Sequence, residues 1–197
     1  MAKRLSRSFY QRPCLEVAPE LLGKGLRRRV GGQELLAQIV EVEAYLGKCD
    51  PASHAFRRTA RSEIMFERGG ACYVYLSYGM NYCMNVVTGK KGEGEAILFR
   101  AAEPLSDPAP FFENRKLPIT GSLRNLLSGP GKLTQALGID LRFNGTLFGA
   151  NGIEIVDLGI AYAPRAIRRG PRIGISKAVE MPYRFTVAGS AFLSRRT

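Results

Sequence analysis

The segment ACYVYLSYGMNYCMNVVTG at positions 71–89 constrains the fold more than any other part of the chain. Apolar side chains alternate with polar or phenolic ones in its first half: Cys72, Val74 and Leu76 against Tyr73, Tyr75 and Ser77. This is the two-residue period of a strand with two unlike faces. The turn formers Gly79 and Asn81 follow, and a second strand-like run covers 82–88. The pattern predicts a β-hairpin with Tyr78-Gly79-Met80-Asn81 at its tip.

A second alternating run, QIVEVEAYLGKCDPASH at 38–54, is unusually acidic for a strand. Its two faces carry Val40, Val42, Ala44 and Leu46 on one side and Ile39, Glu41, Glu43 and Tyr45 on the other. Glutamate is depleted in strands, and like charges on one face repel each other. Two interpretations are open. The segment is a solvent-facing edge strand with two solvated glutamates, or it forms the wall of a site that also receives His54, the only histidine.

The other predicted elements indicate one α+β domain. Strands are expected at 95–103, at 152–158 and near the end of the chain, and short helices at 14–22, 121–127 and 132–137. The proline-rich stretch 104–118 is expected to be a surface loop that covers Phe111 and Phe112. Strands joined by hairpins favour a mainly antiparallel sheet. We expect a basic N-terminal arm over residues 1–8 and a single domain over 9–197.

The charge of the chain points to a polyanionic partner. Its 29 Lys and Arg residues against 17 Asp and Glu give a net charge of +12. So basic a small protein is attracted to nucleic acid, to an anionic membrane or to an acidic partner. No apolar run is long enough to span a membrane, and the basic start lacks the apolar core of a secretory signal. We therefore expect nucleic acid rather than a membrane, and a cytoplasmic (nucleoid) or nuclear protein that is not secreted. The first residues are equally compatible with a disordered solubilising tail.

The cysteines predict neither a metal site nor a disulfide. Cys14, Cys49, Cys72 and Cys83 include no C-x-x-C pair, and one histidine does not complete a usual zinc set. The motif SGPGK at 128–132 is not a phosphate-binding P-loop, because Leu126 and Leu133 stand where that motif needs Gly and Ser or Thr. We expect no metal and no cofactor.

An exposed aromatic at a hairpin tip suits a protein that pushes between stacked bases. Tyr78 stands at the predicted tip, and arginines crowd the segment after His54: Arg57, Arg58, Arg61 and Arg68. These arginines either pair with the acidic strand or hold phosphates, for which a planar guanidinium is well suited. The tip tyrosine either folds back on the sheet or protrudes. A protruding aromatic together with a carboxylate beside tyrosines is what an enzyme needs to flip a base and act on it.

At these same residues the chain resembles the alkyladenine (3-methyladenine) DNA glycosylases. The matching runs appear in family order: VEVEAYLG at 40–47, ASH at 52–54, MF at 65–66, YVYLSYGMNYCMN at 73–85, ILFRAAEPL at 97–105 and SGPGKLTQAL at 128–137, and more weakly RIGI and PYRF near the end. The resemblance implies a curved antiparallel sheet with a protruding hairpin and surrounding short helices.

The resemblance also implies a role for individual residues. Glu43 matches the general base that activates water against C1′ of the flipped nucleotide. The base pocket is matched by Tyr45, His54, Tyr75, Asn85 and Arg100, with Asn85 crowding the 2-amino group of normal guanine. Tyr78 matches the residue that fills the gap in the duplex, and Met80 lies beside it. Asn81 departs from the aromatic residue expected at its position. Candidates for contacts to the DNA backbone are Arg57, Arg58, Lys132 and Arg172.

The implied function is a base-excision-repair DNA glycosylase that acts as a monomer on damaged double-stranded DNA. Its expected substrates are alkylated or deaminated purines: 3-methyladenine, 7-methylguanine, hypoxanthine and ethenoadenine. A carboxylate both activates the water and stabilises the developing positive charge on the sugar. Because no lysine stands in the matching pocket, we predict a monofunctional enzyme without a lyase step. The alternative is a non-catalytic module that binds structured nucleic acid through its basic residues and sheet tyrosines.

Overall fold

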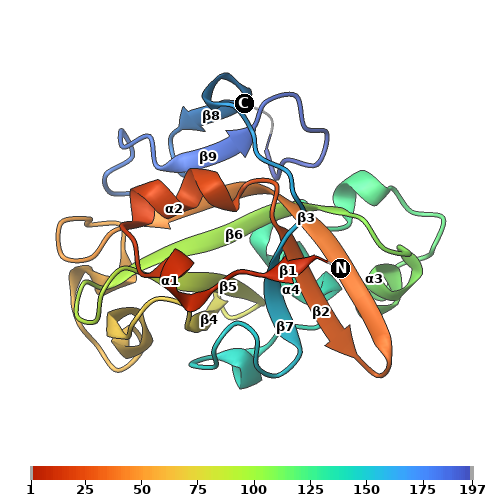
Figure 1. Ribbon diagram of the computed structural model, residues 1–197, viewed down its shortest axis with the longest axis horizontal. Coiled ribbons are helices and arrows are strands. Elements are labelled where there is room, and N and C mark those ends of the chain that lie inside the picture. The colour runs from red at the N-terminus through yellow and green to blue at the C-terminus, as the bar shows by residue number, and fades with distance from the viewer. Residues whose placement is uncertain (1, 196–197) are drawn as a thin grey trace.

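The computed structural model describes residues 2–195, in which nine strands form one antiparallel sheet (Figure 1). The strands are β1 (Lys3–Arg4), β2 (Gly25–Val30), β3 (Gln33–Tyr45), β4 (Cys72–Ser77), β5 (Asn81–Thr88), β6 (Glu95–Pro104), β7 (Ile153–Asp157), β8 (Ile167–Gly170) and β9 (Arg184–Val187). Their order is β1-β7-β2-β3-β6-β5-β4, and β9 pairs with both β3 and β8. The predicted α+β class and the curved, mainly antiparallel sheet are confirmed.

β3 lies in the middle of this sheet. One of its edges pairs with β6 over Ala37–Tyr45, and β2 and then β9 pair along other parts of the strand. Glu41 and Glu43 are completely buried. The interpretation of β3 as a solvent-facing edge strand is therefore wrong. The register between β3 and β6 shifts on both sides of Glu41. Bulges of this kind bend a strand and re-aim its side chains. Consequently Ile39 and Val40 both join the apolar core, although simple alternation assigned them to opposite faces.

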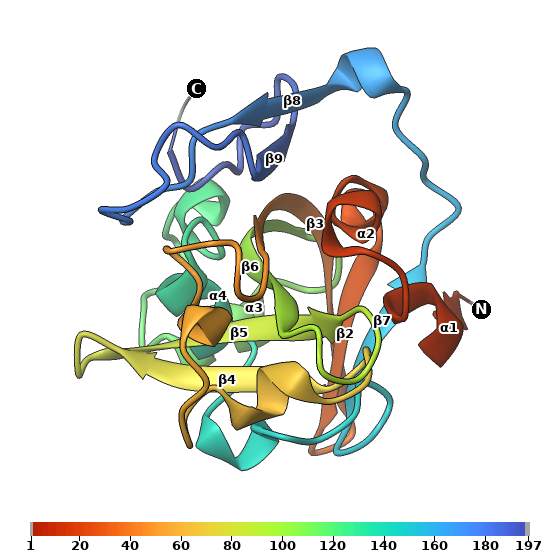
Figure 2. The same cartoon turned by 90° about the vertical axis from the view of Figure 1, so that its left-hand side faces the viewer.

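The predicted hairpin of β4 and β5 extends from the body of the protein (Figure 2). Tyr78 and Gly79 both have positive φ angles, of 48° and 70°, and the amide of Met80 donates to the carbonyl of Ser77 at 3.1 Å. Two successive residues with positive φ make a tight turn whose twist matches that of the flanking strands. The tip is well exposed, with 86% of Tyr78 and 76% of Met80 accessible to solvent. Tyr78 therefore does not fold back on the sheet.

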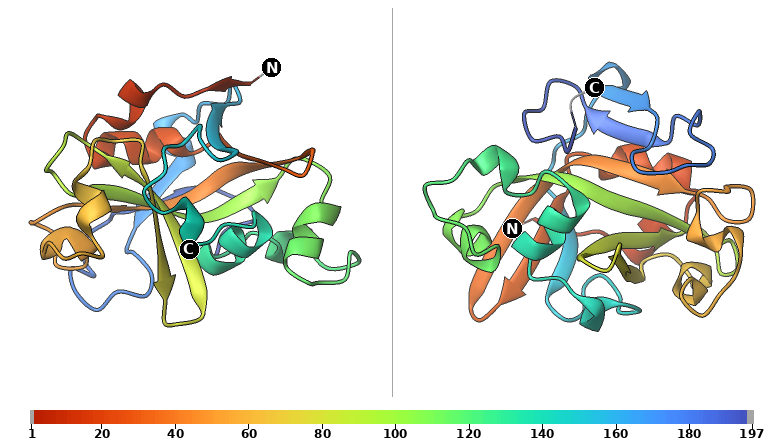
Figure 3. Two further views of the ribbon diagram at one scale, coloured as in Figure 1. Left: turned by 90° about the horizontal axis from the view of Figure 1, so that it is seen from below. Right: turned by 180° about the vertical axis from the view of Figure 1, so that it is seen from behind.

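Short helices pack on both faces of the sheet. They are α1 (Arg7–Tyr10), α2 (Cys14–Leu21), α3 (Ala109–Asn114) and α4 (Pro130–Ala136). Shorter 3₁₀ turns cover His54–Phe56, Glu63–Phe66, Leu123–Asn125, Leu141–Phe143 and Pro164–Ala166. α2 contacts β3 and β6, and α4 contacts β5 and β6 from the other side (Figures 1 and 3). The expected loop 104–118 contains α3, because Phe111 and Phe112 are buried in the main core and need a helical turn to reach it together.

Part of the predicted N-terminal arm belongs to the sheet. Lys3 and Arg4 pair with Asp157 and Val156 of β7, and the amide of Leu5 donates to Ile155 at 2.9 Å. A disordered tail does not describe these residues. Among the described residues, no helix is long and apolar enough to cross a membrane.

Candidate active site

A cleft of about 1010 Å³ opens beside the protruding hairpin. Its walls come from β3, the hairpin, β6, the turn around His54, the start of α4 and the segment 173–177. The cleft thus gathers residues that are far apart in the sequence. All the pocket residues expected from the sequence lie in its lining except Glu43, and so do Tyr78, Met80 and Lys132.

Glu43 lies directly behind the wall of the cleft. Its Oε2 accepts hydrogen bonds from the Tyr45 hydroxyl at 2.8 Å and from Arg100 Nη1 at 3.2 Å, and its Oε1 accepts from the amide of Ile173 at 2.7 Å. All three donor residues line the cleft. Since Glu43 itself is fully buried, a water that reaches its carboxylate from the cleft has to take the place of one of these donors. Burial raises the pKa of Glu43 above its usual range, and the Arg100 charge opposes this rise.

Arg100 links two buried carboxylates. Its Nε donates to Glu41 Oε1 at 3.1 Å while its Nη1 reaches Glu43. Only 7% of the residue is exposed. The two register shifts around Glu41 bring this arginine of β6 beside both glutamates of β3. An unpaired charge at such a depth is very unfavourable, so the ion pairs are needed to keep all three groups ionised.

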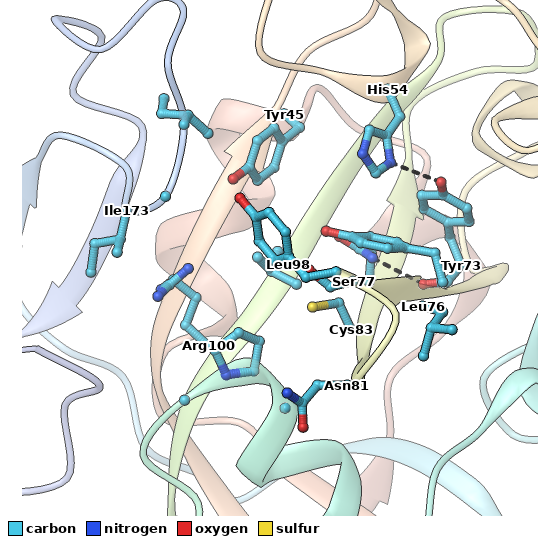
Figure 4. Close-up of a pocket in the computed structure, with 18 of the residues that line it drawn as sticks. Tyr45, His54, Tyr73, Leu76, Ser77, Asn81, Cys83, Leu98, Arg100 and Ile173 are labelled. Carbon is cyan, nitrogen blue, oxygen red and sulfur yellow. Dashed lines mark hydrogen bonds between the residues drawn. The ribbon is translucent and has the colours of Figure 1, made fainter.

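Aromatic rings form the opposite side of the cleft (Figure 4). The rings of His54 and Tyr75 meet edge to face with centroids 4.7 Å apart, and the ring of Tyr73 lies 5.3 Å from that of Tyr75. His54 Nδ1 shares a hydrogen bond of 2.9 Å with the Tyr73 hydroxyl. Burial, and next the nearby Arg61 charge, lower the pKa of His54, which favours the neutral ring at pH 7. Tyr73 was not among the predicted site residues, although it shares a face of β4 with Tyr75.

Tyr45 and Asn85 are held firmly. The guanidinium of Arg172 lies over the Tyr45 ring at 4.6 Å from its centroid. Asn85 is 4% exposed, and its amide nitrogen donates to the carbonyl of Tyr73 at 3.0 Å. A ring clamped from behind and an amide fixed to the backbone give the cleft a defined shape before any ligand binds.

The expected contribution of Arg172 to DNA backbone binding is wrong. Its side chain is 0% exposed and forms two hydrogen bonds to Asp50, of which the one from Nη2 measures 2.8 Å. Its Nη1 also donates to the carbonyl of Ala44 at 3.0 Å. Because its guanidinium is buried between these partners and the Tyr45 ring, Arg172 braces the cleft from inside and does not face a phosphate.

The other predicted basic residues are at the surface. Arg57 and Arg58 are exposed, and Lys132 lies at the start of α4 on the rim of the cleft. Arg58 pairs with Glu63, so part of its charge is neutralised. Arg61, which was not selected from the sequence, covers the Tyr75 ring at 4.9 Å. These side chains give the surface around the cleft a positive charge.

Asn81 connects the base of the hairpin tip to α4. Its Oδ1 accepts a hydrogen bond of 3.0 Å from Gln135, and its side chain lies so close to Gly131 that a Cβ there would meet it at 2.8 Å. The polar residue at this position therefore acts as a brace between two walls of the cleft.

The sequence is similar to known proteins over nearly its whole length. Residues 8–191 match the family model described as methylpurine-DNA glycosylase (MPG). The chain belongs to this family. Relatives named "Putative 3-methyladenine DNA glycosylase" include one from Carboxydothermus hydrogenoformans, 44% identical over 98% of this chain and 99% of the relative. Another, from Alkaliphilus oremlandii, is 41% identical over 98% and 100%. A third, from Koribacter versatilis, is 42% identical over 96% and 92%.

Membership of the methylpurine-DNA glycosylase family confirms the resemblance seen in the sequence. It makes the chain a DNA repair protein of the glycosylase class, whose members are hydrolases of N-glycosidic bonds. Three features of the structure bear on this chemistry: the cleft, the buried carboxylate and the protruding hairpin. Among residues 2–195, no group of three His, Cys, Asp or Glu side chains is placed to hold a metal ion.

Proposed function

We propose that this glycosylase flips alkylated or deaminated purines out of duplex DNA and hydrolyses their N-glycosidic bond with a water activated by Glu43. The observation that carries the proposal is the Glu43 carboxylate. It is fully buried, paired with Arg100 and separated from an aromatic cleft only by groups that bond to it. A base of this kind contributes about 10²–10⁴-fold to the rate.

The proposed mechanism begins when a flipped base enters between Tyr45 on one side and His54 with Tyr75 on the other. A water then takes the place of one of the three hydrogen-bond donors on the carboxylate of Glu43. The carboxylate accepts a proton from this water while the water oxygen forms a bond to C1′. The C1′–N bond breaks, and its electron pair leaves with the base. The negative charge also stabilises the cationic character that develops on the sugar.

The aromatic lining of the cleft favours the binding of purines with an electron-poor ring. 3-Methyladenine and 7-methylguanine are cationic in the nucleotide, so they stack well on phenol and neutral imidazole rings and are good leaving groups. Hypoxanthine and ethenoadenine are also proposed substrates. Asn85 crowds the 2-amino group of normal guanine, because its amide is tied to Tyr73 and does not swing away. We expect Asn85→Ser to increase the release of undamaged guanine.

The hairpin tip and the surrounding cations are proposed to hold the DNA. Tyr78, with Met80 beside it, fills the gap left by the flipped nucleotide, while Arg57, Arg58 and Lys132 contact phosphates. Every group needed for this comes from one chain, and we propose that the enzyme acts as a monomer.

The proposed reaction is monofunctional. The prediction from the sequence rested on the absence of lysine from the pocket, and this reason needs correction. Lys132 and Lys177 do line the cleft, so lysine is not absent from it. Neither makes a hydrogen bond to Glu43. We expect no covalent DNA adduct when the protein is treated with borohydride during turnover. An adduct that disappears in Lys132→Ala or Lys177→Ala would contradict this part of the proposal.

The experiment that tests the function is an excision assay under single-turnover conditions, on duplexes that each contain one alkylated, deaminated or oxidised base. We expect release of the alkylated and deaminated purines only. A protein that binds these duplexes and releases no base from any of them is the non-catalytic module considered above. Salt-dependent binding does not separate the two, since both contact phosphates.

A further inference from the structure

Glu41 is a fully buried carboxylate that accepts four hydrogen bonds close to the cleft. It is 0% exposed and accepts hydrogen bonds from Arg100 Nε at 3.1 Å, Arg184 Nε at 2.8 Å, and the amide and hydroxyl of Ser194 at 2.6 and 2.7 Å. None of Glu41, Arg184 and Ser194 is among the described residues that line the cleft. Glu41 therefore lies outside the cleft, and it acts on Glu43 through its charge and through the residue that the two carboxylates share, which is Arg100.

The four charged groups form a balanced chain. Glu43 bonds to Arg100, Arg100 to Glu41 and Glu41 to Arg184, which gives two negative and two positive charges. Because Arg100 uses Nε for Glu41, only Nη1 is directed at Glu43. Without Glu41, the planar guanidinium is free to turn and to offer both ends of its fork to Glu43, an arrangement that arginine and carboxylate favour.

The C-terminal segment bonds to these charged groups on the side away from the cleft. Ser194 gives two hydrogen bonds to Glu41, and its hydroxyl lies 3.4 Å from Nη2 of Arg100. Arg184 Nη2 in turn donates to the carbonyl of Arg195 at 2.7 Å. Residues of β3, β6, β9 and the C-terminal segment are thus joined at one carboxylate.

We propose that Glu41, locked by Arg184 and Ser194, is a positioning residue that holds Arg100 to a single hydrogen bond with Glu43 and so keeps Glu43 basic. This inference rests on the proposed role of Glu43. It assigns the C-terminal segment a part in the reaction, and it explains why an acidic residue lies inside the sheet two positions before the base.

The test compares Glu41→Gln with a matched control, Glu154→Gln, which removes the carboxylate of another arginine pair of the sheet, with Arg27. The readout is base release against pH on a duplex with one 7-methylguanine, a cationic base that needs no protonation to leave. Glu43 is faced by Glu41 and Tyr45 of β3, Cys83 of β5, Arg100 of β6 and Arg172. Of these, Glu41→Gln removes one negative charge, so the attraction of Arg100 is less opposed and the pKa of Glu43 falls.

We expect the acidic limb of the profile to move to lower pH in Glu41→Gln, and release at neutral pH to slow by up to about 100-fold, with lesion affinity unchanged. Glu41→Asp keeps the charge and is expected to retain the wild-type limb. Glu154→Gln is expected to change neither quantity. A folded Glu41→Gln protein whose acidic limb coincides with that of the wild type would overturn the inference.

Ser194→Ala keeps the test decisive if Glu41→Gln does not fold. It removes one hydrogen bond to Glu41 and one contact to Arg100 without changing any charge, and we expect a severalfold slower release. Wild-type release by Ser194→Ala would then overturn the inference. A wild-type protein that releases no 7-methylguanine would instead refute the proposed function, so the two failures are distinguishable.

Discussion

Replacing Tyr78 by serine separates DNA binding from protein stability. The side chain is 86% exposed at the hairpin tip, so its removal buries and exposes little surface within the protein. We expect the free energy of unfolding to change by less than about 0.5 kcal/mol. The same ring, stacked in the duplex, is worth about 1–3 kcal/mol. This corresponds to roughly 5- to 150-fold weaker binding to a lesion duplex.

The assay measures affinity by fluorescence anisotropy for a duplex with one ethenoadenine and for the undamaged duplex, at one fixed salt concentration. Affinity for undamaged DNA is expected to change little, because phosphate contacts supply most of it. Leu141→Ser is the control, since this residue is 51% exposed and lies outside the cleft. If Tyr78→Ser keeps the same preference for the lesion duplex as Leu141→Ser and the wild type, the assignment of Tyr78 as the wedge is refuted.

Three further predictions follow from the structure of the cleft. Arg172→Met leaves Asp50 buried without its charged partner. We expect urea denaturation to show a free energy of unfolding lower by about 3–5 kcal/mol, and a loss below about 1 kcal/mol would contradict the pairing. Burial raises the pKa of Glu43, and only its ionised form is the base, so release of 7-methylguanine should fall with decreasing pH. The midpoint should lie above the usual glutamate pKa of about 4.3. A midpoint at or below that value would show that the Arg100 charge outweighs burial. Cys49 is exposed whereas Cys14, Cys72 and Cys83 are buried, so a thiol reagent should modify one cysteine rapidly in the native protein, and Cys49→Ser should remove that reaction.

Local patterns in the sequence were sufficient for the hairpin and for part of the cleft. Alternation placed Tyr73 and Tyr75 on one face of β4, and the turn formers after Ser77 located the exposed tip. The same periodicity put Glu43 and Tyr45 together on β3, where the Tyr45 hydroxyl contacts the carboxylate. These features depend on neighbours within one strand or one hairpin, which a sequence shows directly.

Contacts between distant segments were not predictable in the same way. Arg172 stands in a cluster of arginines that suggests a basic surface, but its partner Asp50 lies 122 positions away in the chain. Glu41 had no evident role because its partners come from β6, β9 and the C-terminal segment. The pairing of Lys3 with Asp157 likewise turns part of an apparent arm into a strand. In each case a side chain or strand finds its partner only after the sheet has formed.

The central claim is that Glu43 is the base that activates the water. Its direct test is single-turnover release of hypoxanthine from a duplex by Glu43→Gln, with lesion affinity and thermal unfolding measured on the same preparation. We predict a rate lower by about 10²–10⁴-fold with lesion binding retained. Release at the wild-type rate by a folded Glu43→Gln protein would contradict the claim.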